Sequence, residues 1–371
     1  MAGIAVISAF NCHNYGMYSV DLAAEHFFRE LGLPFTHVVT QRRTRAGKLR
    51  FQLLRRPEDF AGFDRVVYWG DFLSNPMWGA EDYANREMRR HGVRDAATGL
   101  ANWSELYLNL KRHHPAVSVF ALGGCFLGAD TRTSQPTRDQ LVDFLQSAEL
   151  VLPRDGKSLE IVRELAPVEH VRPGMDCAWL LPFGPKPQAS ESRYFICFLG
   201  RTLRRQHKRL AAELAKATGL QPVWLDWLNL RLPRFVAHWN FNRMHRLIAG
   251  ARFVVTDTYH LVINALNRGV RTVCLYDASQ SPTAGSCGDV KKQVLMEESG
   301  FASMLVEVSG SAPLAQRIHR RLQTCDERAE SASFARLAQR RSEFRRELRA
   351  ALVGHAQPQP VIESLIPQAV T

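Results

Sequence analysis

Short apolar runs alternate with helical patterns along most of the chain. Runs such as IAVIS (4–8) and YFICFLG (194–200) have the length of a buried strand, and helix-like segments at 18–31 and 204–219 follow them. Further strand-like runs lie at 65–70, 117–124, 148–154, 221–228, 252–257 and 271–276, and further helix-like segments at 156–165, 242–251 and 261–269. Short apolar strands separated by helices predict parallel sheets with both faces covered.

One segment interrupts this alternation. PFGPKPQASESR (182–193) is rich in proline, glycine and serine and is typical of a linker. A chain of 371 residues is also too long for one ordinary core. We therefore predict an α/β fold with two Rossmann-like domains, residues 1–187 and 188–330, whose parallel sheets face a cleft.

Residues 331–371 are expected to form a basic helix and a proline-rich tail. The run ARLAQRRSEFRRELRAAL predicts an amphipathic helix that turns Leu337, Phe344, Leu348 and Leu352 inward and leaves its arginines in water. The alternative is peripheral contact of this basic helix with anionic lipid at the inner membrane surface.

Composition narrows the classes of protein and partner. The N-terminus lacks the features of a secretory signal, and the apolar runs are too short for a membrane span, so we expect a cytoplasmic protein. A net charge of +12 favours an anionic partner, but no nucleic-acid-binding motif is present. The seven cysteines show no CxxC spacing, and no motif specifies a metal or a bound cofactor, so we expect neither.

The segment TDTYH (256–260) lies where a buried strand changes into a helix. Ligands of open parallel sheets bind at the carboxyl ends of strands, beside helix N-termini that favour anions. His260 could therefore contact an anion or transfer a proton, with Thr258 and Tyr259 beside it. Asp257 has a simpler alternative, which is to cap the following helix.

Other loops take the equivalent position. After the first strand, Asn11, Asn14, Tyr15 and Gly16 would bring polar groups and a flexible backbone next to a ligand. The loop after 65–70 could present Asp71 or Asn75 to an acceptor hydroxyl, although a helix cap is an equal alternative.

Two more loops supply cations. Arg154 could grip a carboxylate or phosphate through two hydrogen bonds, whereas its neighbour Asp155 is expected to cap a helix. Arg201 follows the first strand of the second domain and would face a phosphate.

With these residues in view, the chain resembles the polysaccharide pyruvyl transferase family. The similar segments are separated by dissimilar ones but occur in the family's order, over about residues 8–305. The family's most characteristic stretch is a Thr-Asp-Arg-Leu-His-Gly motif before a helix, and it is resembled here by ARFVVTDTYHLVINALNRGVRTVCL. The other similar segments are NYGMYSVDLA, FDRVVYWGDFL, LVLPRDGKSLEIVREL, GMDCAWLL and the lysine-bearing GDVKKQVLMEESGF.

The resemblance implies a GT-B-like fold and transfer of a pyruvyl group from phosphoenolpyruvate to sugar hydroxyls as a ketal, without metal or cofactor. It implies that the donor binds to the second domain, where His260 would contact the donor or act as a general acid. The saccharide acceptor would bind to the first domain. Two positions depart from the family: Thr258 replaces the motif arginine, and Met17 replaces an aspartate. A threonine cannot replace a bidentate anion contact, so Arg154, Arg201 or Lys291 would have to compensate.

Three functions follow as hypotheses. The first is a pyruvyl transferase of cell-surface polysaccharide biosynthesis, such as exopolysaccharide assembly. The second is a nucleotide-sugar glycosyltransferase of GT-B fold, in which Asp226 or Asp257 would contact a ribose. The third is a degenerate, non-catalytic member of the family, because fold analogy does not settle function.

Overall fold

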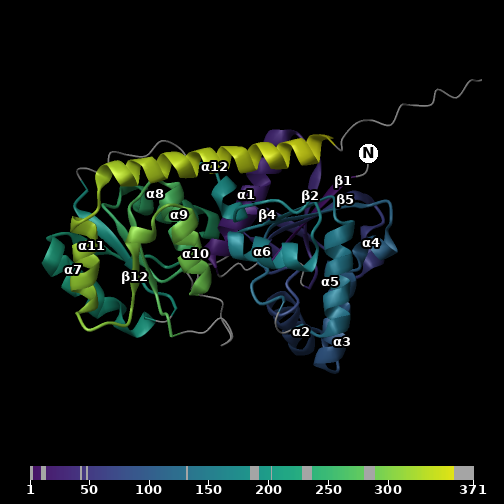
Figure 1. Ribbon diagram of the computed structural model, residues 1–371. Coiled ribbons are helices and arrows are strands. Elements are labelled where there is room, and N and C mark those ends of the chain that lie inside the picture. Colours follow the sequence, from purple (N-terminus) through teal and green to yellow (C-terminus); the bar gives the residue numbers. More distant parts are fainter. Residues whose placement is uncertain are drawn as a thin grey trace, which may run out of the picture.

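Each half of the chain forms its own β-sheet in the computed structural model (Figure 1). The structure describes residues 3–9, 14–41, 44–46, 49–130, 133–183, 192–201, 203–227, 236–279 and 289–354. All strands of the first sheet precede residue 154 and all strands of the second follow residue 193. The predicted boundary near residue 188 lies in the interval between the two sheets and stays a prediction.

The first sheet has seven strands in the order β3-β4-β2-β1-β5-β6-β7. They are β1 (Gly3–Ser8), β2 (Phe35–Val39), β3 (Thr44–Ala46), β4 (Leu49–Leu53), β5 (Phe63–Asp71), β6 (Ser118–Gly124) and β7 (Leu150–Pro153). All neighbours are parallel except β3 and β4, which are antiparallel. The expected parallel sheet is confirmed, with an antiparallel edge added to it.

The second sheet has five strands in the order β12-β11-β10-β8-β9 and is parallel throughout. They are β8 (Tyr194–Phe198), β9 (Gln221–Val223), β10 (Val254–Thr256), β11 (Thr272–Tyr276) and β12 (Leu305–Glu307). The strand expected over 221–228 is present only as the short edge strand β9.

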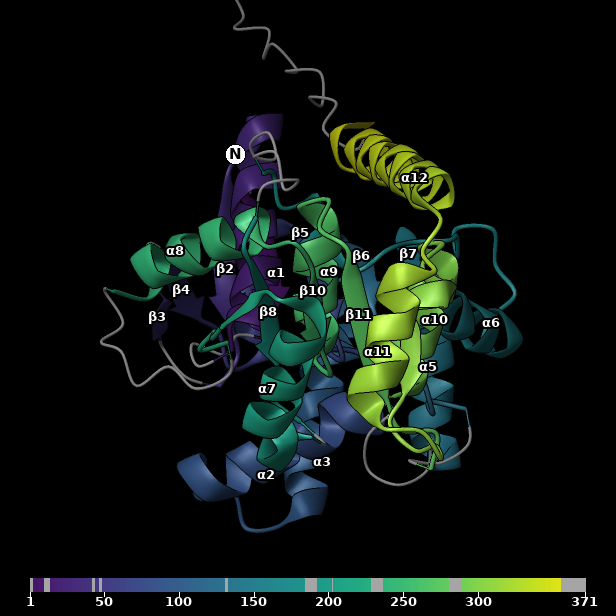
Figure 2. The same cartoon turned by 90° about the vertical axis from the view of Figure 1, so that its left-hand side faces the viewer.

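Helices cover both sheets (Figure 2). The first half contains α1 (Tyr15–Leu31), α2 (Trp78–His91), α3 (Ala96–Tyr107), α4 (Leu110–His113), α5 (Gln135–Ser147) and α6 (Gly156–Leu165), with the 3₁₀ turns η1 (Pro57–Phe60) and η2 (Cys177–Leu180). The second contains η4 (Arg204–Gln206), α7 (His207–Thr218), α8 (Ala237–Gly250), α9 (Tyr259–Asn267), α10 (Val290–Glu298), η6 (Ala302–Met304) and α11 (Leu314–Gln323). The chain is thus α/β with two Rossmann-like units.

The last helix, α12 (Glu327–Gly354), runs across both units (Figure 1). The prediction for its inner face is confirmed, since Leu337, Phe344, Leu348 and Leu352 are all buried. This apolar stripe packs against both halves of the molecule and helps to join them.

Ion pairs of α12 reach both units as well. Arg345 pairs with Glu30 of α1 at 2.8 Å, and Arg340 pairs with Glu298 of α10 at 3.3 Å. Glu298 also accepts a 2.5 Å hydrogen bond from the backbone N–H of Gly156, at the start of α6. The C-terminal helix, α10 and α6 are therefore tied together across the domain boundary.

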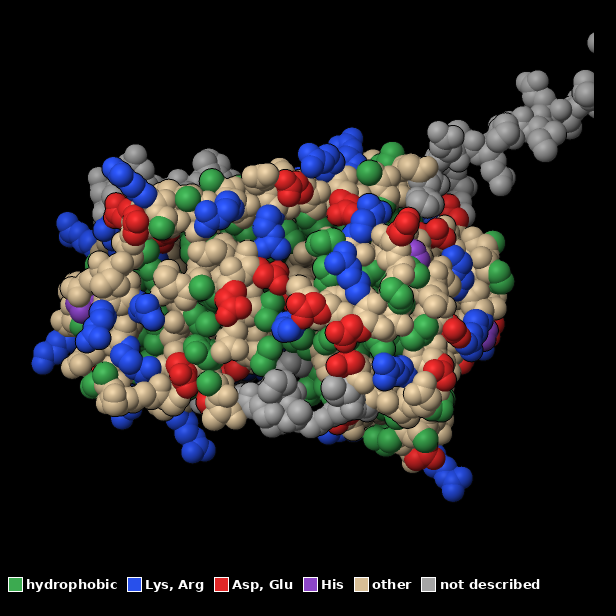
Figure 3. Space-filling model, viewed as in Figure 1, with side chains coloured by type: hydrophobic (Ala, Val, Ile, Leu, Met, Phe, Trp, Pro, Cys, Tyr) green, Lys and Arg blue, Asp and Glu red, His purple; other side chains and the backbone are tan. Residues whose placement is uncertain are grey.

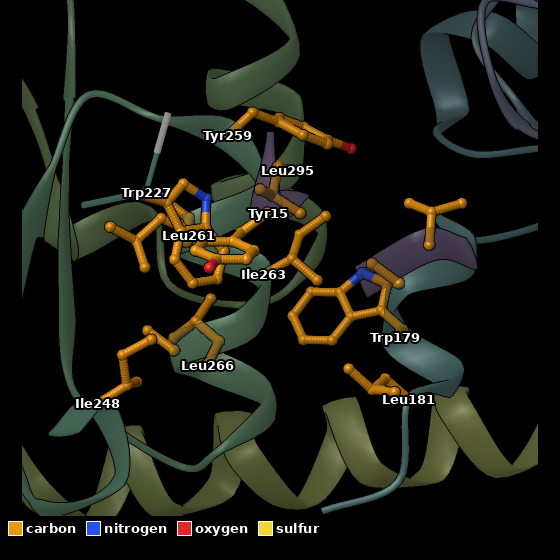
Figure 4. Packing of buried hydrophobic residues seen from close by; sticks show 14 of the residues in the cluster. Tyr15, Trp179, Leu181, Trp227, Ile248, Tyr259, Leu261, Ile263, Leu266 and Leu295 are labelled. Atoms are coloured by element: carbon orange, nitrogen blue, oxygen red, sulfur yellow. The ribbon is translucent and has the colours of Figure 1, made fainter. Parts of the chain in front are cut away.

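Helix α1 and the second unit share a continuous apolar core. Tyr15 packs edge-on against Trp227 with ring centroids 5.9 Å apart, and Figure 4 shows both near Leu261 of α9. The Tyr15 hydroxyl donates to the carbonyl of Ala237 at 3.2 Å and accepts from Asn240 at 2.8 Å. This side chain fixes one domain against the other.

Basic and acidic side chains are intermixed on the face shown in Figure 3, so the net charge of +12 is not gathered there. Among the described helices, none is both long enough and apolar enough to cross a bilayer.

Candidate functional site

Five loops at the carboxyl ends of strands meet between the two units. On the first-domain side, they carry Gly16 after β1, Asp71 at the end of β5 and Arg154 after β7. On the second-domain side, His260 lies in the first turn of α9 after β10, and Lys291 lies in the first turn of α10 after β11. The site geometry thus follows from the parallel topology, which brings these strand ends together.

Gly16 allows the two domains to approach at His260. A Cβ atom added to Gly16 would lie 2.5 Å from His260 Cβ and 2.9 Å from His260 Nδ1. No side chain can occupy that space, so glycine is required by a close approach rather than by its backbone angles. The adjacent Asn14 caps α1 by accepting a 2.9 Å hydrogen bond from the Gly16 N–H.

Arg154 and Lys291 meet over the same two aromatic rings. The Arg154 guanidinium carbon lies 4.7 Å from the Tyr259 ring centroid and 5.3 Å from that of Phe72. The Lys291 ammonium lies 5.3 and 5.4 Å from these two centroids. Both cations lie within the range of cation–π attraction, so the two rings hold like charges close together.

Each of these cations keeps hydrogen-bonding capacity for a ligand. The Arg154 side chain is 1% exposed; its Nε donates to Asp155 at 3.1 Å, but its Nη2 has no partner among the described residues. Lys291 is half-buried and, within the same ranges, makes no hydrogen bond or ion pair. Burial, followed by the charge of Arg154, lowers the pKa of Lys291 to about 8. An anion between them would satisfy both groups.

His260 faces a carboxylate across the domain boundary. Its Nε2 lies 3.4 Å from Asp176 Oδ2, and its side chain is 12% exposed. Burial acts to raise the pKa of Asp176, but the neighbouring His260 and Arg154 outweigh it and leave that pKa lowered. The Asp176 carboxylate therefore lies close enough to His260 to orient its ring.

Asp71 combines backbone strain with a free carboxyl group. Its φ angle of 56° makes it a non-glycine residue in the left-handed region, and it follows Gly70 at φ 75°. Such a conformation costs about 1–2 kcal/mol for a residue with a Cβ. Burial raises the pKa of Asp71, although His260, Arg154 and Lys291 counteract that increase. This combination is typical of a functional position.

The remaining residues of the TDTYH segment stabilise the fold. The Asp257 carboxylate accepts hydrogen bonds from the backbone N–H groups of Gly200, Arg201 and Leu203 at 2.8–3.3 Å. It therefore caps the loop after β8 instead of helix α9, whose N-cap is Thr258. The Thr258 hydroxyl in turn donates to Asp257 at 3.3 Å.

Several predicted residues take structural or peripheral positions. Asp155 caps α6 by accepting from Ser158 N–H at 2.8 Å, and Asn75 accepts from two N–H groups at the start of α2. Arg201 has an exposed side chain, yet its charge contributes to the lowered pKa of Lys291. Tyr15 is fully buried with its hydroxyl engaged, and Asn11 lies outside the described residues.

The neighbouring Lys292 differs sharply from Lys291. Its ammonium is buried, pairs with Asp289 at 2.6 Å and donates to the carbonyl of Leu275 at 2.8 Å. Adjacent lysines on α10 therefore divide the roles, one holding the fold and one facing the site.

A small cavity of about 20 Å³ lies behind Arg154 and Tyr259, toward α12. Glu298, Leu337 and Arg340 form its far side. It has room for about one water molecule and is not a substrate site. In the described ranges, no group of three or more His, Cys, Asp and Glu side chains could hold a metal ion.

Sequence reasoning missed Phe72 and Asp176. Asp176 is the single acid of the apolar segment GMDCAWLL, and a lone acid in such a segment was an available signal. Phe72 could not be recognised as a site residue from the sequence, because an aromatic residue after a strand is ordinarily interpreted as part of the hydrophobic core.

Comparison with known proteins confirms the resemblance drawn from the motifs. The family model for polysaccharide pyruvyl transferase matches residues 101–279. The matched stretch contains Arg154, Asp176, Arg201 and His260, whereas the loop with Gly16, the strand end at Asp71 and Lys291 fall outside it. No protein with a curated description matches the chain.

Solved structures share the overall architecture. A UDP-N-acetylglucosamine 2-epimerase superposes with a TM-score of 0.52 at 12% identity, covering 97% of this chain and 98% of its own. The spinosyn forosaminyltransferase reaches 0.46 at 11% identity over 95% and 99% of the two chains. The Medicago truncatula protein UGT71G1, complexed with UDP-glucose, reaches 0.45 at 10% identity over 96% and 97%. The fold is GT-B-like, and at these identities the likeness concerns the fold alone.

Proposed function

Because residues 101–279 match the polysaccharide pyruvyl transferase family, we propose that this protein transfers a pyruvyl group from phosphoenolpyruvate to sugar hydroxyls. The reaction would serve cell-surface polysaccharide biosynthesis from the cytoplasmic side. The single observation that carries the proposal is the meeting of Arg154 and Lys291 over Tyr259 and Phe72, where Arg154 Nη2 has no partner in the described part of the chain.

The donor is a small molecule with a phosphate and a carboxylate, and two neighbouring cations suit it. Arg154 would bind one anionic group through its free guanidinium edge, and Lys291 would bind the other. Tyr259 would support both cations through its ring. These contacts would replace the anion contact that Thr258 cannot make. Arg201 would add positive charge at the edge of the site.

Proton transfer is assigned to His260. In ketal formation two acceptor oxygens bond to C2 of the donor, the bond from C2 to the phosphate oxygen breaks, and C3 gains a proton. The two acceptor hydroxyls release two protons, of which one balances C3 and the other leaves with the phosphate. His260, oriented by Asp176, would give the proton to C3 and recover one from the acceptor.

The acceptor would lie against the first domain. Asp71 would accept a hydrogen bond from an acceptor hydroxyl and take its proton, and Asn14 and Gly16 would line the approach beside His260. Asn11 stays a predicted contact of the same loop. Tyr15 is left out of this group because its hydroxyl already bonds to the second domain.

The test is binding of phosphoenolpyruvate by isothermal titration calorimetry, followed by an NMR assay for ketal formation with pooled oligosaccharide acceptors. We expect saturable binding that Arg154→Met and Lys291→Met each weaken. Lys157→Met removes an exposed lysine of the same domain that is paired with Glu160, and it should bind normally. Absence of binding to the unaltered protein would overturn the donor assignment.

The nucleotide-sugar alternative makes a different prediction. It rests on the GT-B-like fold and needs a free acid for a ribose, but Asp257 already accepts several backbone hydrogen bonds. A rise in melting temperature with UDP but none with phosphoenolpyruvate would favour the glycosyltransferase. Full biological activity of His260→Ala would instead favour a non-catalytic role.

A further inference from the structure

Helix α6 begins with a backbone N–H group that is bonded from the other domain. Gly156 is the first residue of α6, and a helix provides no acceptor of its own for that N–H. The local capping residue, Asp155, bonds the Ser158 N–H at 2.8 Å instead. The Gly156 N–H donates to Glu298 of α10 at 2.5 Å. A carboxylate of the second domain thus completes the cap of a first-domain helix, at the end where the helix dipole favours negative charge.

Glu298 is held in this position by α12. Arg340 donates to the Glu298 carbonyl at 2.5 Å and pairs with its carboxylate at 3.3 Å. Figures 1 and 2 both show α6 and α10 side by side below α12. The Glu298 side chain is 29% exposed, so solvent screens it less than a carboxylate of an open surface ion pair. The contact is therefore built from three helices rather than from two mobile surface side chains.

The same two segments carry cations of the site. Gly156 lies two residues after Arg154, so the bonded N–H group is next to the turn that presents the guanidinium. On α10, Glu298 lies seven residues after Lys291. Seven residues are nearly two helical turns, so Lys291 and Glu298 lie on one face of α10, about 10 Å apart along its axis.

One face of α10 therefore approaches the first domain at two points. At one point Lys291 meets Arg154 over the Tyr259 ring. At the other, Glu298 bonds to Gly156. Because a helix is a rigid rod over two turns, the second contact constrains the first.

The space between the two contacts leaves little freedom of movement. The cavity of about 20 Å³ behind the site is lined by Arg154 and Tyr259 on one side and by Glu298 and Arg340 on the other. It has room for about one water molecule, and the side chains around it are otherwise packed together. A displacement of Glu298 would therefore be transmitted to the neighbouring cations.

We propose that Glu298 is an interdomain latch, a positioning residue that sets the separation between Arg154 and Lys291 by bonding the start of α6 from the second domain. That these two cations bind the donor rests on the proposed function. The latch acts through the backbone of α6 and the rigid length of α10, and Glu298 itself is assigned no contact with the donor.

The first test needs no donor and uses NMR hydrogen exchange of the protein labelled with ¹⁵N-glycine. We expect slow exchange of the Gly156 amide in the unaltered protein, because a carboxylate of the other domain holds it. Glu298→Ala should accelerate this exchange by about 10- to 100-fold. Glu297→Ala is the matched control, because Glu297 is the preceding residue of α10 and is exposed. Fast exchange of Gly156 in the unaltered protein, or equal acceleration by Glu297→Ala, overturns the proposal.

The second test measures phosphoenolpyruvate affinity by calorimetric titration in two backgrounds. In the otherwise unaltered protein, Glu298→Ala should weaken binding about tenfold, because the cations lose their fixed separation. In a Lys291→Met background the same change should have almost no further effect, because a separation between two cations no longer exists. A purely structural role predicts an equal loss in both backgrounds, and that result would refute the positioning role.

Two further variants examine the contact itself. Glu298→Gln keeps an acceptor oxygen for the Gly156 N–H and should recover most of the affinity that Glu298→Ala loses. Gly156→Ala tests the contact from the side of α6, because a Cβ atom there would lie 2.8 Å from Glu298 Oε1 and would displace the carboxylate without removing its charge. It should weaken binding to a similar extent, so the proposal can be refuted even if Glu298→Ala does not fold.

Failure of the latch and failure of the proposed function give different results. If phosphoenolpyruvate does not bind the unaltered protein but the Gly156 amide behaves as expected, the donor assignment fails and the latch between the domains stands. If phosphoenolpyruvate binds and neither Glu298→Ala nor Gly156→Ala weakens it, the donor assignment stands and the latch does not position the cations.

Discussion

On the second-domain side of the site, the carboxylates are occupied by the chain itself. Asp257 holds the loop after β8 through three backbone N–H groups, and Asp289 accepts from Asp277 N–H at 2.6 Å while it pairs with Lys292. On the first-domain side, the Asp71 carboxyl group accepts no backbone hydrogen bond from the described residues, and Asp71 sits on a strained backbone. Aspartate thus stabilises loops on one side of the site, whereas on the other side its carboxyl group makes no such bonds to the described part of the chain.

The contrast explains the charge of the site. Among the described residues, the acids of the second domain fix loops, and no carboxylate of that domain pairs with Lys291 or His260. The first domain supplies Arg154 and Asp71. Cations therefore reach the site from both domains.

The largest expected difference is in stability. Asp257→Ala should lower the free energy of unfolding by about 3 kcal/mol, because several charge-assisted hydrogen bonds are lost at once. Asp71→Gly should instead raise it by about 1 kcal/mol, because glycine removes the cost of the left-handed backbone. Urea denaturation followed by circular dichroism measures both. Equal destabilisation by the two changes would remove the distinction between the sides.

The next difference concerns donor affinity. Arg154→Met should weaken phosphoenolpyruvate binding by about 100-fold, since it removes the buried cation with a free guanidinium edge. Lys291→Met should cost only about tenfold, because this half-buried ammonium is partly neutral near its lowered pKa of about 8. Calorimetric titration compares them. A larger loss for Lys291→Met would assign the main contact to the second domain.

The close approach of Gly16 in the first domain to His260 in the second can be tested by substituting Gly16. Gly16→Ala should lower turnover about tenfold, because the added methyl group would displace His260. Gly62→Ala is the matched control, since a Cβ at Gly62 meets no atom within 4 Å. Steady-state kinetics at fixed donor concentration gives the comparison. Unchanged turnover in Gly16→Ala would mean that His260 can move without loss.

Much of the architecture could be predicted from the sequence. The helix expected at 156–165 has those bounds, Asp155 caps it, and α12 turns its four predicted apolar residues inward. These features depend on local chemistry and on periodicity, which a sequence displays directly. The three strands on one side of the first sheet, β2, β3 and β4, were missed. Strands β3 and β4 lie in TRAGKLRFQLLRR, which is too rich in charge to suggest a strand.

The site was harder to predict, because burial on α1 does not follow its sequence pattern. Asp21 and Glu25 are spaced four residues apart, as on a solvent-exposed helical stripe, yet both are buried because the sheet and the second domain enclose the helix. Tyr15 was expected to face a ligand and instead packs against the other domain. Domain contacts of this kind are absent from any local pattern.

The smallest expected effect is a pH dependence of donor affinity that distinguishes Lys291 from Arg154. Burial and the nearby Arg154 lower the pKa of Lys291 to about 8, so its charge is present below that pH and is lost as the pH rises through it. Phosphoenolpyruvate affinity should therefore fall by a few-fold between pH 7 and pH 9, because the second-domain cation loses its charge. Lys291→Arg should abolish that fall, because a guanidinium stays charged throughout the range. If the fall persisted in Lys291→Arg, a group other than Lys291 would control it, and the second-domain cation would not titrate as its surroundings indicate.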